Sequence, residues 1–179
     1  MKLRPILSTA LLAGCVSIAN ADTCKSEPGS ITCGKGEVNS LTGNGMVNVN
    51  GTTILGDTDV NGMLNATDGS FNKLNVNGTA SLVQCTINEI AQIKGTLTAS
   101  SSKFENTLSI YSNMTRFINS KVNYNLTINH TDNKEQKVYL DNHSEVNGDI
   151  TFEDKNGKVI VRGGSKVTGN IYGGKLINQ

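Results

Sequence analysis

Short apolar and polar patterns repeat along this chain at nearly constant intervals. One pattern recurs at steps of 17, 16 and 17 residues, and its copies are marked by Gly45, Gly62, Gly78 and Gly95. A second pattern, seven residues long, begins at Ser120, Ser144 and Ser165. Self-similarity at a fixed period is typical of solenoids, in which each repeat forms one turn of a winding chain.

From residue 47 onward the apolar positions form three series. The first consists of alternating pairs: Val47/Val49, Leu64/Ala66, Ala80/Leu82, Leu97/Ala99, Val138/Leu140 and Val159/Val161, with Thr115/Phe117 as the weakest member. The second consists of single residues: Phe71, Ile87, Phe104, Val122, Val146 and Val167. The third is again paired: Leu74/Val76, Ile90 with Ile93, Leu108/Ile110, Leu126/Ile128, Ile150/Phe152 and Ile171. Alternation of apolar and polar residues predicts half-buried strands.

The spacing of these series indicates how the strands are connected. Members of the second series are separated by 16, 17, 18, 24 and 21 residues, and those of the third by 16, 18, 18, 24 and 21. Both series lengthen at the same turns, as expected of faces of one winding chain. We therefore predict an all-β fold: a single-stranded, triangular parallel β-helix of about seven coils. Right-handed winding is expected from the handedness of parallel crossovers.

The corners between the strands fit this prediction. Gly45, Gly62, Gly78 and Gly95 precede the first series, often after Asn, and we expect them to adopt positive φ. The same is expected of Gly148 and Gly169, which lie between the second and third series.

The two longest turns carry insertions at one corner, residues 129–137 and 153–158. Insertions in repeat folds gather on one edge, which is often the binding edge. The candidate binding residues are His130, Asp132, Lys134, Glu135, Glu153, Asp154, Lys155 and Lys158. The alternative is that the loops are solvated and bind nothing.

The N-terminus has the features of an export signal. Lys2 and Arg4 precede an apolar stretch that is too short to span a bilayer. Cleavage after Ala21 would define residues 1–21 as a signal peptide. Alternatively, Leu12-Ala13-Gly14-Cys15 resembles a lipobox, so residues 1–14 would be a lipoprotein signal and Cys15 a lipidation site. We expect contact with a membrane only if Cys15 is lipidated.

Export to an oxidising compartment makes Cys24 and Cys33 candidates for a disulfide. They lie in residues 22–43, which do not fit the repeat cleanly and which we interpret as an N-terminal cap before the β-helix of residues 44–179. Cys85 is expected to be a small buried side chain.

The composition argues against several functions. A formal net charge of +1 offers no concentrated basic face for nucleic acid, and no nucleotide motif is present. His130 and His143 lack the fixed spacing of a metal site, so we expect no metal or cofactor. Asp57, Asp59 and Asp68 are the candidates for glycosidic chemistry, but nothing in the sequence places them together. We therefore do not expect an enzyme.

Part of the chain resembles a known family. Residues 146–150, 158–161 and 167–171 are similar to the repeated coil motif of bactofilin-like, polymer-forming proteins. That resemblance covers residues 144–171 best and implies a right-handed triangular β-helix that assembles without nucleotide. Typical members are cytoplasmic, whereas this chain carries an export signal, and its expected cap would block assembly at one end. Residues 175–179 begin another strand, so Leu176 and Ile177 are candidates for end-to-end dimerisation through residues 172–179.

From the sequence we therefore expect an exported, non-enzymatic β-solenoid that acts as a structural or binding module. It would be periplasmic, secreted or an outer-membrane lipoprotein, with a protein or glycan partner. The alternative is a β-helix that binds or degrades carbohydrate.

Overall fold

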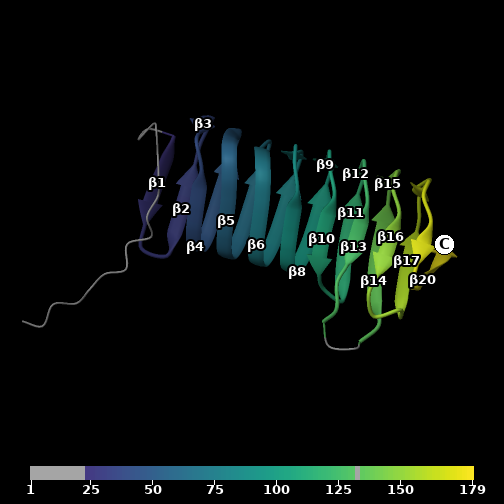
Figure 1. The fold of residues 1–179 in the computed structure, drawn as a ribbon. Coiled ribbons are helices and arrows are strands. Elements are labelled where there is room, and N and C mark those ends of the chain that lie inside the picture. Colours follow the sequence, from purple (N-terminus) through teal and green to yellow (C-terminus); the bar gives the residue numbers. More distant parts are fainter. Residues whose placement is uncertain (1–22, 132–133) are drawn as a thin grey trace, which may run out of the picture.

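The computed structural model describes residues 23–131 and 134–179. These residues form an all-β solenoid of about nine turns, somewhat more than the seven expected, and contain no helix. In Figure 1 the turns lie side by side as a rod, with the N-terminal coils at one end and the C-terminal coils at the other. At about 4.8 Å per coil, the rod is on the order of 40 Å long. The predicted signal peptide, Cys15 and Asp132 lie outside the described residues.

The strands form three parallel ladders, one for each face. The first face contains β2 (Ser30–Cys33), the later parts of β4 (Leu41–Asn50), β5 (Thr52–Thr67), β6 (Ser70–Val83) and β8 (Ala91–Ser100), then β11 (Met114–Ile118), β14 (Gln136–Asp141), β17 (Gly157–Val161) and β20 (Gly174–Asn178). The second contains β3 (Gly36–Val38), the starts of β5 and β6, β7 (Thr86–Ile87), β9 (Lys103–Phe104), β12 (Lys121–Val122), β15 (Glu145–Val146) and β18 (Lys166–Val167). The third contains the start of β4, the middle of β5 and β6, the start of β8, then β10 (Leu108–Tyr111), β13 (Leu126–Ile128), β16 (Ile150–Phe152) and β19 (Ile171–Tyr172).

The core consists of the predicted apolar series, stacked one residue over the next. Phe104 pairs with Val122, and Val122 pairs with Val146, in parallel register. All three side chains are buried. The series also extend further toward the N-terminus than expected, because Val38 and Ile54 precede Phe71 in the second one.

Two predictions about the strands are wrong. The inward residue of the third face in the fourth turn is Ala91, which pairs with both Leu74 and Leu108. Ile90 instead points outward and is 56% exposed. The regular coils also start at Ser30, where β2 pairs in parallel with β4, whereas the β-helix was expected to begin at residue 44.

The glycines at the corner between the third and first faces have the positive φ that was expected. Gly62 has a φ of 137°, and a Cβ on it would lie 2.2 Å from the carbonyl oxygen of Gly45 in the preceding coil. Gly148 and Gly169 are different, since neither has a positive φ. A Cβ on Gly148 would lie 2.5 Å from the carbonyl carbon of Tyr124. Close approach of neighbouring coils, rather than backbone conformation, explains these two glycines.

The corner between the first and second faces is filled by a column of small polar residues. Its members in successive coils are Thr52, Gly69, Cys85, Ser102, Ser120, Ser144 and Ser165. From Cys85 to Ser144, each backbone N–H donates to the side-chain hydroxyl of the next coil, over distances of 2.9–3.1 Å. The hydroxyls in turn donate to carbonyl groups, such as Ser120 to Ile118 over 2.9 Å. The column thus satisfies the polar groups of a buried corner.

Candidate functional site

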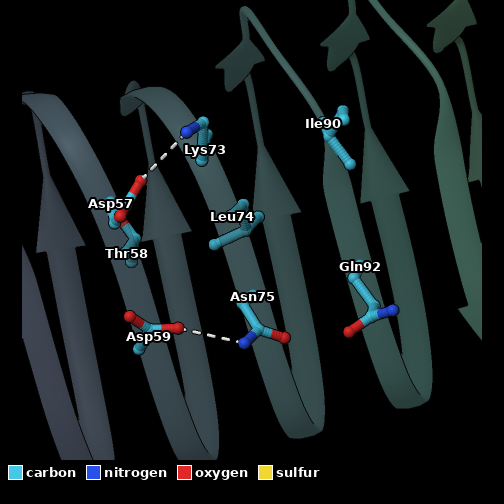
Figure 2. A pocket seen from close by; sticks show the side chains of 8 residues that line it. All are labelled: Asp57, Thr58, Asp59, Lys73, Leu74, Asn75, Ile90 and Gln92. Atoms are coloured by element: carbon cyan, nitrogen blue, oxygen red, sulfur yellow. Dashed lines mark hydrogen bonds and ion pairs between the residues drawn. The ribbon is translucent and has the colours of Figure 1, made fainter.

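A groove of about 390 Å³ lies on the third face (Figure 2), across three successive coils. It is lined by Asp57, Thr58, Asp59, Lys73, Leu74, Asn75, Ile90 and Gln92. The outward residues of adjacent coils stand in a row across it, because Asp59 pairs with Asn75 and Asn75 with Gln92 in the parallel ladder. The ladder register therefore creates a polar surface from residues distant in sequence.

The charged groups of this groove contact each other. Asn75 donates from Nδ2 to Asp59 over 3.0 Å. The ammonium group of Lys73 lies 3.7 Å from Asp57 and 3.8 Å from Glu89. The groove thus presents an amide and paired carboxylates, which are groups that bind hydroxyls.

Of the three aspartates considered for glycosidic chemistry, the structure brings together two. Asp57 and Asp59 lie on β5 and line the groove, whereas Asp68 lies at the corner that follows β5 and has a φ of 52°. The contributions of Lys73, Asn75 and Gln92 were missed from the sequence. The sequence did contain a signal for them. Lys73 directly precedes the inward Leu74, Asn75 lies between the inward Leu74 and Val76, and Gln92 lies between the inward Ala91 and Ile93. Alternation along a strand therefore predicts that all three side chains point outward.

The predicted binding edge is formed by the loops after β13 and β16, which lie in adjacent coils. The imidazole Nδ1 of His130 contacts the carboxylate of Asp154. The backbone N–H of His130 donates to Glu153 over 3.0 Å, and that of Thr131 to Asp154 over 3.4 Å. The side chain of Asp154 is only 4% exposed. These residues hold the two loops together.

A second ion-pair cluster lies beside the first. Glu135 contacts Lys158 of the next coil, and lies 3.1 Å from Lys137. Hydrogen bonds from Lys158 and then Lys137 hold the pKa of the Glu135 carboxyl below its ordinary value. Lys134 and Lys155 are exposed at the same edge. The structure therefore gathers the described candidates on one edge, but ion pairs among these residues neutralise much of their charge.

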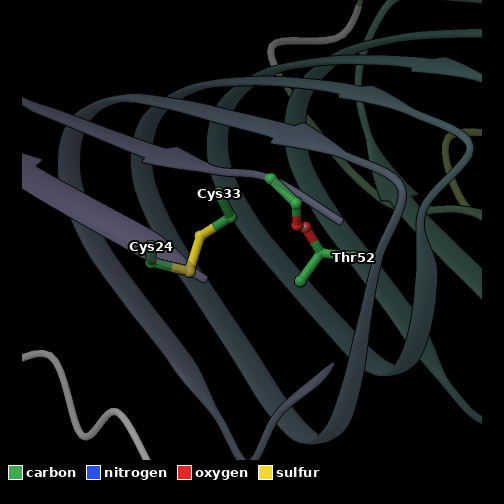
Figure 3. Close-up of a disulfide and its surroundings, with 4 residues drawn as sticks. Cys24, Cys33 and Thr52 are labelled. Atoms are coloured by element: carbon green, nitrogen blue, oxygen red, sulfur yellow. Dashed lines mark hydrogen bonds between the residues drawn. A yellow bond between two sulfur atoms is a disulfide. The ribbon is translucent and has the colours of Figure 1, made fainter. Parts of the chain in front are cut away.

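The N-terminal end is closed by a disulfide (Figure 3). Strand β1 (Cys24–Glu27) pairs antiparallel with β2, and Cys24 lies opposite Cys33 in that pairing. The two form the predicted disulfide, and both are buried. Cys33 also pairs with Val49 of the next coil, so the disulfide covers the first apolar stack. Nearby, the hydroxyl of Thr52 donates to the carbonyl oxygen of Gly34 over 2.6 Å.

At the other end, β20 pairs with β17, and within the described residues no strand pairs with its opposite edge. Leu176 stacks on Val159 but is 48% exposed, and Ile177 is partly buried. Val167 and Ile171 in the preceding turn are also only partly buried. The two self-association candidates thus belong to an exposed apolar surface.

No group of three or more His, Cys, Asp or Glu side chains in residues 23–131 and 134–179 is arranged to hold a metal ion. In the same part of the chain, no helix has the length and apolar character needed to cross a membrane. Comparisons of the chain with models of protein families, with curated proteins and with solved structures gave no match.

Proposed function

We propose that this protein is an exported, non-enzymatic β-solenoid that serves as a rigid structural or binding module at the bacterial cell envelope or outside the cell. The observation that carries the proposal is the closed N-terminal end, where the Cys24–Cys33 disulfide covers the apolar stack. Disulfides persist in oxidising compartments and are rare in the cytosol. The apolar start of the chain, with its two alternative processing sites, supports export independently.

The rod offers rigidity rather than a moving catalytic centre. Side-chain hydrogen bonds link neighbouring coils at several positions, for example Asn61 to Asn44 over 3.2 Å and Asn77 to Asn61 over 3.3 Å. The carboxylates of the third-face groove are engaged by Lys73 and Asn75. Because these carboxylates are already paired, the groove is better suited to holding a binding partner than to transferring protons. The resemblance of residues 144–171 to the coil motif of bactofilin-like proteins also favours a scaffold.

Export can be tested with the full chain produced in a bacterial host under its own N-terminus. We expect cell fractionation to place it in the envelope or the medium. Mass spectrometry should find either a chain that starts at Asp22 or one with a lipid on Cys15. Cys24 and Cys33 should react with a thiol reagent after reduction only. An unprocessed chain in the cytosol with both thiols reactive would refute the proposal.

The binding role can be tested by a photocrosslinker at Lys155, on the predicted binding edge formed by the loops after β13 and β16 (the loop edge). A matched crosslinker at Thr127, on the third face, is the control. We expect the crosslinker at Lys155 to capture a defined partner in the cell envelope, and the crosslinker at Thr127 not to capture it. Equal capture from both positions would show that the loop edge is not the contact surface.

A second candidate function is carbohydrate binding or cleavage at the third-face groove, because its row of Asp59, Asn75 and Gln92 offers one carboxylate and two amides, groups that form hydrogen bonds with sugar hydroxyls. Binding of neutral oligosaccharides that is lost in Asn75→Ala and Gln92→Ala would favour this candidate. Release of reducing ends from a polysaccharide, lost in Asp59→Asn, would show cleavage and contradict a non-enzymatic role.

A further inference from the structure

A second groove lies on the first face, with a volume of about 440 Å³. It is lined by Thr96, Leu97, Thr98, Met114, Arg116, Tyr139 and Arg162. Thr98 pairs with Arg116, and Arg116 pairs with Tyr139, in successive coils. Arg162 directly follows β17, in the coil after Tyr139. The groove thus crosses four coils, a length of about 14 Å at the usual spacing of parallel strands.

One end of the groove is cationic and aromatic. The guanidinium of Arg116 lies 5.4 Å from the centre of the Tyr139 ring, and that of Arg162 lies 5.3 Å from it. The two arginines come from the coils on either side of Tyr139. Stacking on the ring fixes the position of both guanidinium groups.

A carboxylate of the protein already lies between these arginines. Asp141 accepts from Nε of Arg162 over 2.7 Å and from its Nη2 over 3.3 Å. It also lies 3.2 Å from Nε of Arg116. The side chain of Asp141 is 14% exposed, whereas those of Arg116 and Arg162 are 46% and 36% exposed. The guanidinium groups of Arg116 and Arg162 are therefore placed so that both can bind one carboxylate.

The arginines retain unused donors. A guanidinium has five N–H groups, and the contacts to Asp141 occupy a minority of those on Arg116 and Arg162. The remaining N–H groups have no hydrogen-bond partner within residues 23–131 and 134–179. A second carboxylate can therefore bind from the solvent side without displacing Asp141.

The other end of the groove is neutral. The hydroxyls of Thr96 and Thr98 have no hydrogen-bond partner in the described part of the chain, and Met114, next to them, is 55% exposed. Hydroxyl groups beside an apolar side chain suit a sugar ring, which has hydroxyls at its rim and C–H groups on its faces.

The net charge of this face differs from that of the third-face groove. In the first-face groove and at its rim, Arg116 and Arg162 are opposed by Asp141 alone, so two basic groups face one acidic one. In the third-face groove and at its rim, Asp57, Asp59 and Glu89 are opposed by Lys73 alone. A ligand with negative charge is therefore attracted to the first face and repelled by the third.

We propose that the first-face groove binds an acidic oligosaccharide, which lies along the rod axis across four coils. A carboxylate of the sugar binds the free N–H groups of Arg116 and Arg162. A neighbouring sugar ring packs on Met114 and donates to or accepts from Thr96 and Thr98. This site is separate from both the loop edge and the third-face groove, and it does not depend on the structural role proposed above.

The test is isothermal titration calorimetry of the full chain with a tri-uronate oligosaccharide. The same trisaccharide with its carboxyl groups reduced to alcohols is the matched neutral probe. We expect binding of the acidic trisaccharide and at least tenfold weaker binding of the neutral one. The double variant R116Q/R162Q should lose at least tenfold in affinity for the acidic trisaccharide. The charge-matched variant R116K/R162K should lose less, because lysine keeps the charge and loses the fork.

Thr96→Val with Thr98→Val tests the neutral end, and Thr127→Val with Thr151→Val, a pair on the third face that lines neither groove, is the control. The first variant should weaken binding of the acidic trisaccharide severalfold, and the control should bind as the unmodified chain does. Circular dichroism and unfolding curves show that each variant is folded. No binding of the acidic trisaccharide, equal binding of its neutral form, or an equal loss in the control with Thr127→Val and Thr151→Val would overturn the proposal. So would equal affinity for inorganic phosphate or a single-stranded oligonucleotide.

Discussion

The backbone N–H of Ser102 donates a hydrogen bond of 3.0 Å to the hydroxyl of Ser120, one coil further along the rod. Ser120 is 3% exposed, and its hydroxyl in turn lies 2.9 Å from the carbonyl oxygen of Ile118. This contact recurs from coil to coil, so each serine satisfies a buried N–H that the strand ladder leaves without a partner.

Ser120→Ala should therefore destabilise the fold. The change leaves the buried N–H of Ser102 without an acceptor, a loss of about 1–3 kcal/mol in the free energy of unfolding. Chemical denaturation measures the loss. Ser81→Ala, at a half-exposed position on the first face, is the matched control and should change stability by less than about 0.5 kcal/mol. Equal effects at both positions would contradict a role for the column.

Cys85 occupies a position that serines fill in the next four coils. Its N–H donates to Ser102 over 3.1 Å, and its thiol lies 3.3 Å from the carbonyl oxygen of Val83. Cys85→Ser should fold with a stability within about 1 kcal/mol of the original, because both hydrogen bonds are retained. A variant that fails to fold in thermal unfolding would show that the sulfur is needed for packing.

Burial also raises the pKa of the Cys85 thiol above its ordinary value of 9.0, while backbone hydrogen bonds with Gly69 and Val83 act in the opposite direction. The folded state thus favours the protonated thiol. This contribution to stability is fully present below pH 9.0 and is lost as the pH rises through the folded pKa. Alkylation of Cys85 at pH 8–9 should be slow in the folded protein and fast in denaturant. Equal rates would contradict its burial.

Thr115 is an imperfect member of the first apolar series. It pairs with Leu97 and Val138, is 1% exposed, and its hydroxyl has no hydrogen-bond partner in the described part of the chain. Thr115→Val removes the unpaired hydroxyl at nearly constant volume and should stabilise the fold by about 1 kcal/mol. Denaturant unfolding measures the change, and a loss of stability would indicate a buried water or another partner at this hydroxyl.

The disulfide should contribute measurably to stability at the N-terminal end. Its two cysteines are 9 residues apart, and closure of so short a loop contributes roughly 2–3 kcal/mol in the chain-entropy model. The variant C24A/C33A should lose about that much, and a reducing agent should lower the melting temperature of the original chain but not of the variant. An unchanged melting temperature in both would contradict the role of the disulfide as a closure.

Self-association through the C-terminal coil remains a prediction. Leu176 is 48% exposed, and with the partly buried Ile177 it belongs to a strand paired on one side within the described residues. Light scattering should find a dimer that Leu176→Lys converts to a monomer, because a buried charge opposes the contact. A monomer unaffected by this substitution would exclude association through this surface.

Much of the fold could be predicted from the sequence, because burial in a solenoid depends on short, regular alternation. Phe104, Val122 and Val146 illustrate this, since their spacing alone placed them over one another. Ile90 was wrongly predicted to point inward because isoleucine is more apolar than its neighbour Ala91. The phase of the strand, and not side-chain hydrophobicity, decides which residue points inward.

The grooves were harder to predict than the core. Arg116, Tyr139 and Arg162 are separated by intervals of 23 residues, and each lies between or after inward residues of the first series. The ladder pairs Arg116 with Tyr139, so the meeting of these two could have been derived from the inward series. Arg162 is out of that register, because Tyr139 pairs with Ile160 and Arg162 lies just after the end of β17. The depth of a groove cannot be derived in this way, because it depends on side-chain sizes across several coils.

The central claim is that consecutive coils stack in the register of the parallel ladders, and paired cysteines test it most directly. Thr127 pairs with Thr151 in the next coil, which pairs with Tyr172 in the coil after that. Adjacent parallel strands lie about 4.8 Å apart, within the Cα separation of a disulfide, whereas strands two coils apart lie about 10 Å apart and exceed it. In a Cys85→Ser background, mild oxidation should form a new disulfide in the variant T127C/T151C and none in the variant T127C/Y172C. Rapid linkage of the distant pair, or none of the adjacent pair, would contradict the stacked register.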